Sequence, residues 1–448
     1  MTPNTSNFFF TAPWDPVPLR RGDALGLGAL ADQFSNAVAP DLSNRISDGR
    51  WVTLLAWSLV QSQRAFHASG GRSVVTRNEQ SQRYAWLRPL ELMWVARTIS
   101  LLEKDDWEQR PLPGRRRVAP WVDSKRTRDR FGLTPEQFRA YRQTGSYGGY
   151  RRAFRKWPGL TLGDGWTPGQ HSVALANWLD GKLNGARLQL ADDLGRGAKM
   201  ALGKEQTWWL RQWANFSHSD KSSDLKNTLP RQRGDFFVLP EAQLLKPIIF
   251  GDDASGQKRL LMVQAIAISK GGDLETLRHH LSQHFHTDPT IARLAAFSRL
   301  ADAGLAAMDL VAQALNGQPE IALTEVARQK AAKGICKTLH AAAQDWLAEP
   351  DMVLRHADAA ARFATAISTA DPIKCLGKLL RHHETYGGGL RWFVLRNDRV
   401  EARTPSSNRV ARYGFRLWSL CRLAVQCGVL ASMPKALHDD TDWEDQDA

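Results

Sequence analysis

Apolar side chains recur at helical spacing along most of the chain. Residues 23–38 and 44–67 place apolar positions three and four residues apart, so each stretch predicts an amphipathic helix. Residues 80–104 continue the pattern, although Pro89 lacks a backbone donor and divides the stretch. We therefore expect residues 23–104 to form a helical, tryptophan-rich bundle. The apolar face of its second helix contains Trp51, Leu54, Leu55, Trp57, Leu59 and Val60.

The helical spacing returns after an irregular region. Residues 201–257 show no steady period, and we expect them to form an irregular connection. Residues 258–386 are rich in alanine, leucine and arginine, with short breaks at glycine and proline. Small residues allow helices to pack closely, so these residues predict a second helical bundle.

The pattern changes after three consecutive glycines at 387–389. Residues 390–403 predict two short strands around a tight turn at Asn397 and Asp398. Residues 408–430 then predict an amphipathic helix, so we expect a hairpin and a basic helix over 387–437, followed by an acidic tail over 438–448. The residues expected to face inward on this helix are Phe415, Leu417, Trp418, Leu420 and Leu423.

Residues 105–200 combine helices with glycine-rich turns. Thr134 and Pro135 are typical of a helix start, and the glycines between 158 and 169 predict a short hairpin after a second helix. Helix, turn, helix and hairpin is the order of a winged-helix unit. Together with an extended arm over 1–22, these patterns predict a mainly α-helical, multidomain protein with short β-hairpins of winged-helix type.

Composition narrows the class of partner. The 448-residue chain has a formal net charge of +14 and a pI of about 9.8, which favours a polyanion such as nucleic acid. We expect no membrane span, because no run of about eighteen uncharged apolar residues occurs. The N-terminus lacks the pattern of a signal peptide, and the four cysteines form no CxxC pair. We therefore expect a cytoplasmic protein with free thiols.

Most of the positive charge lies in one basic stretch, residues 110–156. It contains fourteen lysines and arginines against three acids, with aromatic residues between them. Such a pattern is typical of a surface that contacts nucleic-acid phosphates. Gly148 and Gly149 would let backbone amides approach a phosphate, and Tyr147 and Tyr150 are candidates for hydrogen bonding or stacking. The cations expected to contact phosphate are Arg115, Arg116, Arg117, Lys125, Arg126, Arg128, Arg151, Arg152, Arg155 and Lys156.

The C-terminal hairpin and helix form a second basic site in the sequence. Only Asp398 and Glu401 oppose its arginines, and a basic wing followed by a basic helix could lie along a duplex or dock on an acidic protein. Its arginines are Arg391, Arg396, Arg399, Arg403, Arg409, Arg412, Arg416 and Arg422.

The histidines do not predict a metal site. His280 and His284 would share a face of a helix, but Leu281 stands where a zinc protease of the HExxH type needs glutamate. We expect the histidines at 279–286 to lie at a solvated helix end, and those at 382–383 to interact with a helix dipole.

No other motif predicts a reaction. The chain lacks a P-loop, a strand-borne GxGxxG and a GxSxG element. A nuclease would need carboxylates on strands, and Asp235 and Glu241 are the nearest candidates. We therefore predict no catalytic residue, no metal and no cofactor.

Three separate patches carry a resemblance. They read DALGLGALAD with LSNRISDGRW, GSYGGYRRAF with PGLT and GDGWTPG, and GGGLRWFVL with YGFRLWSLCRLAVQCGVL. Together they resemble uncharacterised proteins of bacterial defence and restriction islands. The resemblance implies a component of an anti-phage system that acts with other protein subunits, and it identifies no functional residue.

The predicted function is binding of nucleic-acid backbone, namely double-stranded DNA, by a non-catalytic subunit of a larger assembly. The sequence leaves three alternatives open. They are an RNA- or tRNA-binding protein, a divergent metal-dependent nuclease, and a scaffold whose basic surfaces meet acidic protein subunits.

Overall fold

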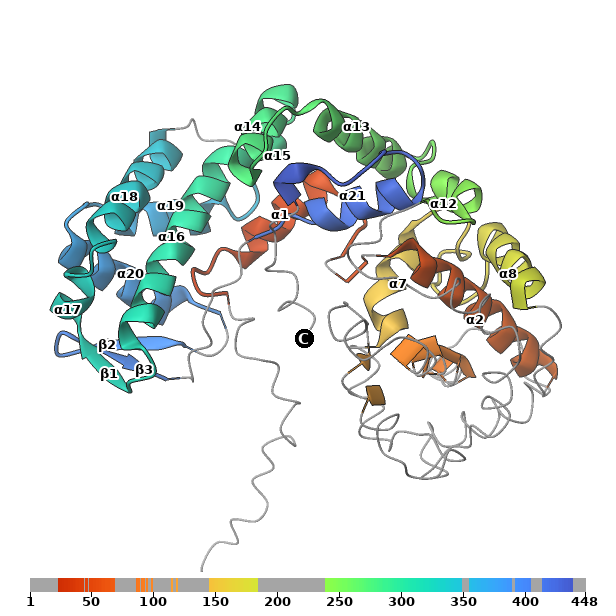
Figure 1. The fold of residues 1–448 in the computed structure, drawn as a ribbon, viewed down its shortest axis with the longest axis horizontal. Coiled ribbons are helices and arrows are strands. Elements are labelled where there is room, and N and C mark those ends of the chain that lie inside the picture. Colours follow the sequence, from red (N-terminus) through yellow and green to blue (C-terminus); the bar gives the residue numbers. More distant parts are fainter. Residues whose placement is uncertain are drawn as a thin grey trace, which may run out of the picture.

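The protein is mainly α-helical. The structure, a computed structural model, describes residues 23–43, 45–46, 48–68, 145–183, 238–348, 354–388, 391–403 and 413–437, with scattered positions between 86 and 119. Its described helices follow a curve in which a central group joins two limbs (Figure 1). One small antiparallel sheet accompanies them, so the predicted fold class of helices with short hairpins is confirmed.

One limb, which we call the α7 limb, is built around α2. The six apolar residues predicted to line one face of this helix are all buried. The indole of Trp57 donates a hydrogen bond of 2.5 Å to Asp180 and ties α2 to α8, against which it packs along its length. The named helices of this limb in the described ranges are α2 (Gly49–Ala68), α7 (Ser146–Lys156), α8 (Gln170–Leu183) and α12 (Ala242–Ile249).

The central group contains α1 and the helices that follow α12. Asp253, Asp273 and Asp288 cap the N-termini of α13, α14 and α15, since each carboxylate accepts backbone N–H groups of the first turn. Phe34 of α1 stacks on Phe297 with ring centroids 4.6 Å apart. The elements are α1 (Gly28–Val38), α13 (Ala254–Ile268), α14 (Leu274–His284), α15 (Pro289–Ala292), α21 (Leu417–Gln426) and the 3-10 helix η3 (Lys435–Leu437).

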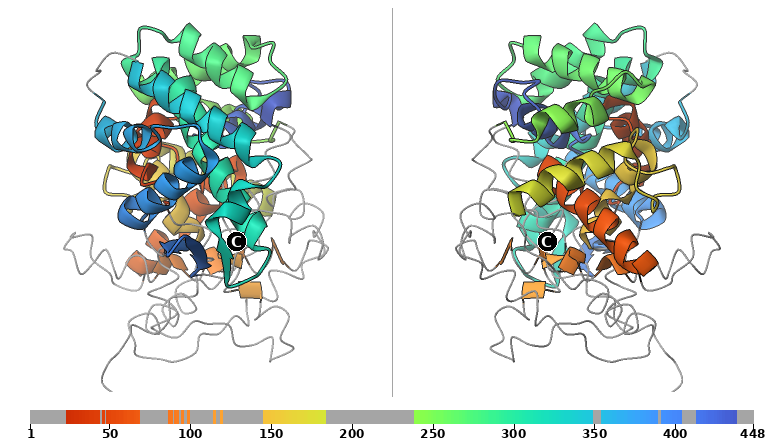
Figure 2. Two further views of the ribbon diagram at one scale, coloured as in Figure 1. Left: turned by 90° about the vertical axis from the view of Figure 1, so that its left-hand side faces the viewer. Right: turned by 90° about the vertical axis from the view of Figure 1, so that its right-hand side faces the viewer.

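The other limb, which we call the sheet limb, carries the only named strands of the described residues. Its elements are α16 (Leu294–Leu315), β1 (Glu320–Ala322), α17 (Leu323–Ala327), α18 (Ala332–Ala348), α19 (Ala357–Ala366), α20 (Pro372–Tyr386), β2 (Phe393–Arg396) and β3 (Arg399–Ala402). Figure 2 shows the two limbs from their outer sides.

The predicted C-terminal hairpin is present. Asn397 and Asp398 have φ of 47° and 58°, the left-handed values that a type I′ turn requires. Strand β3 pairs with β2 on one side and with β1 on the other, which gives the order β1-β3-β2. The sequence pattern did not predict β1, because it is three residues long and lies between two helices.

The helix predicted after the hairpin is also present, as α21. The five residues expected to face inward are all buried.

The predicted domain division stays a prediction, and contacts cross its boundaries: β1 pairs with β3, and Asp48 accepts a hydrogen bond from Arg422. All four cysteines are buried free thiols. In the ranges that the structure describes, no helix is both long and apolar enough to span a bilayer.

Candidate nucleic-acid interface

Helix α7 carries much of the described part of the basic stretch. Its sequence SYGGYRRAFRK alternates rings and cations at helical spacing, so the two kinds of side chain lie on different faces. The buried face contains Tyr147, Tyr150, Ala153 and Phe154, while Arg152, Arg155 and Lys156 are exposed. The helix contains no acidic residue, so its outer face is cationic.

The two tyrosines have internal roles. The hydroxyl of Tyr150 donates to the carbonyl of Asp48 and accepts from the N–H of Asp48, both at 3.0 Å. The hydroxyl of Tyr147 donates to the carbonyl of Gly165, and burial raises the pKa of Tyr147 above its usual value. Both rings are buried, so the predicted stacking on a ligand gives way to a role in holding α7 in place.

The glycines at 148–149 also serve packing. A Cβ on Gly149 would lie 3.0 Å from the Cβ of Arg45, so glycine allows the segment before α2 to approach α7. The N–H of Gly149 donates to the carbonyl of Gly145 at 3.0 Å, and its own carbonyl accepts from Ser43. The N–H of Gly149 therefore donates within the helix and does not face a phosphate. Gly148 is half-buried.

The cations of α7 differ in how strongly they are held. The guanidinium of Arg151 lies 5.5 Å from the ring centroid of Trp166, and this side chain is half-buried. Arg152 donates to Asn36 at 2.9 Å and lies 3.8 Å from the carboxylate of Asp41, yet its side chain is 41% exposed. Arg155 and Lys156 extend into solvent at the C-terminal end of the helix.

One arginine of the second basic site, Arg416, shares a hydrogen-bond acceptor with Arg152 of α7. Arg416, which precedes α21, donates to Oδ1 of Asn36 at 2.7 Å, and the same oxygen accepts from Arg152. Arg416 is buried, which lowers its pKa to about 10, and Asp32 lies 3.4 Å away. Its predicted contact with phosphate is therefore replaced by a contact inside the fold.

The other described arginines of the second site lie at the β2–β3 hairpin or are buried. Arg399 pairs with Glu320 at 2.9 Å and Arg403 pairs with Glu401 at 2.8 Å. Arg391 and Arg396 are exposed, but on the sheet limb, across the curve from α7 (Figure 1). Arg422 is buried and pairs with Asp48 at 2.7 Å.

The remaining predicted contacts fall mostly outside the described residues. Arg115 occupies a half-buried helical position. The cations that lie outside the described residues are Arg116, Arg117, Lys125, Arg126, Arg128, Arg409 and Arg412. Among the described candidates, Arg391 and Arg396 are exposed on the sheet limb. Arg152, Arg155 and Lys156 lie together on the outer face of α7, which we call the α7 cationic face.

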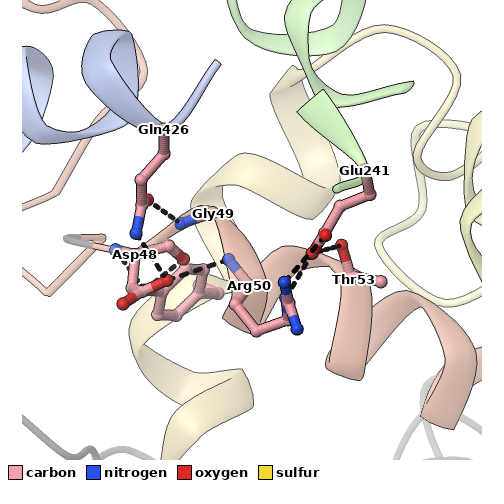
Figure 3. A network of polar contacts seen from close by, with 7 residues as sticks. Asp48, Gly49, Arg50, Thr53, Glu241 and Gln426 are labelled. Carbon is pink, nitrogen blue, oxygen red and sulfur yellow. Dashed lines mark hydrogen bonds and ion pairs between the residues drawn. The ribbon is translucent and has the colours of Figure 1, made fainter. Parts of the chain in front are cut away.

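The nuclease candidate Glu241 belongs to a buried polar network (Figure 3). The guanidinium of Arg50 binds both of its carboxylate oxygens, one of them at 2.8 Å from Nη2, and Thr53 donates at 3.3 Å. Glu241 is 1% exposed, and burial raises its pKa. This carboxylate is a partner of Arg50 in the core, and Asp235 lies outside the described residues.

The same network joins α2 to α21. Gln426 accepts from the N–H of Gly49 at 2.8 Å and donates to Asp48 at 3.1 Å (Figure 3). Asp48 also accepts from the N–H of Arg50 at 2.9 Å. These bonds satisfy the polar groups at the start of α2, so the network positions the α7 limb against the central group.

The histidines take structural partners. His280 contacts the carbonyl of Ala265 at 3.1 Å, and among the residues placed by the structure no three metal-ligating side chains gather. His382 and His383 are buried on α20, where they contact the carbonyls of Leu25 and Ala24 at 3.0 and 2.7 Å. The predicted helix-dipole role is therefore secondary to a link between α20 and the segment before α1.

Comparisons with known proteins return no relative. The chain matches no protein-family model, no curated protein and no solved structure.

Proposed function

We propose that the protein binds the phosphate backbone of nucleic acid, namely double-stranded DNA, through the α7 cationic face. The observation that carries this proposal is the geometry of α7. Its inner face is fixed by buried rings, and its outer face presents Arg152, Arg155 and Lys156 without an acid in the helix. Exposed guanidinium and ammonium groups on a rigid support are the donors that contact phosphate oxygens.

The internal partners of Arg152 support a positioning role for this residue. Asn36 and Asp41 hold its guanidinium while 41% of the side chain remains exposed. Arg155 and Lys156 lie on the following turn of the same helix and are exposed. A helix that presents cations on successive turns can follow phosphates along one strand of a duplex.

The wider proposal is a non-catalytic subunit of a multi-protein bacterial system, with anti-phage defence as its setting. The buried state of Glu241 argues against this carboxylate as part of a nuclease. Other subunits would supply any chemistry that acts on the bound nucleic acid.

Salt dependence of binding tests the proposal. A fluorescently labelled DNA duplex is titrated with the full chain at several salt concentrations, and the slope of log affinity against log salt is measured. Three phosphate contacts predict a slope of about −2.7. A duplex RNA of the same length separates the RNA-binding alternative, and affinity that does not change with salt would contradict backbone binding.

A further inference from the structure

The turn between α7 and α8 exposes a leucine at its tip. Leu162 is 75% exposed, more than any other large apolar side chain among the described residues. Gly163 follows it with φ of +91°, and a Cβ at this glycine would meet no atom within 4 Å. The tip therefore projects away from the rest of the fold.

This turn is held in place by many hydrogen bonds. Thr161 pairs with Pro168 across the turn, and the N–H of Leu162 donates to the carbonyl of Thr167 at 3.0 Å. The hydroxyl of Thr161 donates to the carbonyl of Phe154 at 2.5 Å, which fixes the turn to the C-terminal end of α7. The exposed leucine is thus presented by a defined structure.

Asp164 is the only acidic residue of the turn, and its carboxylate accepts hydrogen bonds from within the turn. Asp164 accepts from the N–H groups of Trp166 and Thr167 at 2.7 and 2.8 Å, and from the hydroxyl of Thr167 at 2.6 Å. Its charge is used to shape the turn. The stem of Arg155 packs on the same turn, since its Cγ lies 2.8 Å from the place of a Cβ on Gly165.

An apolar tip beside cations fits a duplex better than it fits a bilayer. Proteins that kink DNA insert single apolar side chains between base steps while cations nearby bind the phosphates. A membrane surface would need a larger apolar face, and the turn offers one leucine. The charge of Arg155 and Lys156 complements the two phosphate backbones that flank a base step.

We propose that Leu162 is a wedge that enters the base stack of the bound duplex while the α7 cationic face holds the backbone. The inference rests on the proposed function and adds the mode of binding. It predicts a preference for duplexes with pyrimidine–purine steps such as TA, because these steps unstack most easily.

The test uses the full chain and a duplex that carries 2-aminopurine beside a TA step, since the fluorescence of this base rises when it is unstacked. Wild type should raise the fluorescence, and Leu162→Ala should bind about tenfold more weakly without the rise. The salt slope should be unchanged, because the phosphate contacts remain. Ile268→Ala, at an exposed apolar position on α13, is the matched control and should behave as wild type.

The experiment separates failure of the proposed wedge from failure of the proposed function. Salt-dependent binding without a fluorescence rise, or with a rise that Leu162→Ala retains, overturns the wedge and leaves the proposed function standing. No binding to any duplex overturns both. Association of the chain with anionic lipid vesicles that Leu162→Ala abolishes, in place of an effect on DNA, would assign the leucine to a membrane instead.

Discussion

Arg152 and Arg416 donate hydrogen bonds to the same atom, Oδ1 of Asn36, at 2.9 and 2.7 Å. The first guanidinium belongs to α7 and the second precedes α21, so this amide joins two basic segments that are distant in the sequence. Asp32 and Asp41 lie beside the pair and offset its repulsion. Part of the basic character of the chain therefore serves its fold.

Removing the shared acceptor should destabilise the fold. Asn36→Ala leaves the buried guanidinium of Arg416 without this partner, and we expect the free energy of unfolding to fall by about 1–3 kcal/mol. Urea denaturation measures the change. Asn177→Ala, at an exposed position on α8, is the control and should change stability little. Equal stability of the two variants would show that the shared acceptor contributes nothing.

The buried pair of Arg50 and Glu241 should matter more than an exposed pair. Glu241→Gln leaves the charge of Arg50 unpaired in the core, which costs about 3–5 kcal/mol of unfolding free energy. Asp358→Asn breaks an exposed pair with Arg362 on α19 and should change stability little. Thermal and urea denaturation compare the two, and a mild effect of Glu241→Gln would contradict the structural role given to this carboxylate.

The buried histidines should make the fold sensitive to mild acid. His383 donates from Nδ1 to the carbonyl of Ala24 and accepts from the N–H of Trp392 at Nε2, a pattern that only the neutral ring supports. Burial lowers the pKa of His383, and also of His382, below the usual value of about 6.5. The unfolded chain then takes up protons at a higher pH than the folded chain.

Mild acid should therefore destabilise the folded state. The free energy of unfolding should be constant well above pH ~6.5 and should decrease as the pH falls through that value, because protons favour the unfolded state. Urea denaturation at several pH values should show this decrease, and a variant with His382→Gln and His383→Gln should show less of it. His279→Gln, at an exposed position, should keep the wild-type profile. A variant profile as steep as that of wild type would refute the assignment.

The cysteines should be inert in the folded state. Burial raises the pKa of Cys421 and of Cys427, and all four thiols are buried. We expect a thiol-specific chromogenic reagent to react slowly with the native protein. After denaturation, the same reagent should titrate all four thiols. Fast reaction of one or more thiols without denaturant would contradict the packing.

Periodicity was sufficient to predict helices in both bundles and the hairpin, but α12 lies within residues 201–257, which were expected to be irregular. Hydrophobic spacing identified α1, α2 and α21, and it also identified buried residues of α2 and of the α21 region, since a buried helix face must be apolar. The turn at Asn397 and Asp398 was predictable because few residue types accept its left-handed backbone. Strand β1 was not, because its pairing with β3 is a long-range contact without a local signal.

The distribution of charge in the sequence predicted the exposed cations less well than hydrophobic periodicity predicted the helices. Composition cannot tell an exposed arginine from one such as Arg416 or Arg422, whose partners lie on distant segments. The tyrosines of α7 carried the same ambiguity, since a ring between cations can face the core or a ligand. Leu162 was missed because one leucine in a glycine-rich turn has no pattern, and its exposure follows from hydrogen bonds within the turn.

Charge reversal on α7 tests the central claim most directly. Arg155→Glu with Lys156→Glu changes two exposed side chains and leaves the held guanidiniums of Arg151 and Arg152 in place. The matched control, Lys333→Glu with Lys337→Glu on α18, changes the net charge equally on the sheet limb.

We predict that the α7 variant binds a DNA duplex at least about tenfold more weakly than the control and has a salt slope smaller in magnitude by about 2. Both variants should unfold at the same urea concentration as wild type. Equal loss of binding in the two variants, or wild-type binding by the α7 variant, would show that α7 is not the nucleic-acid interface.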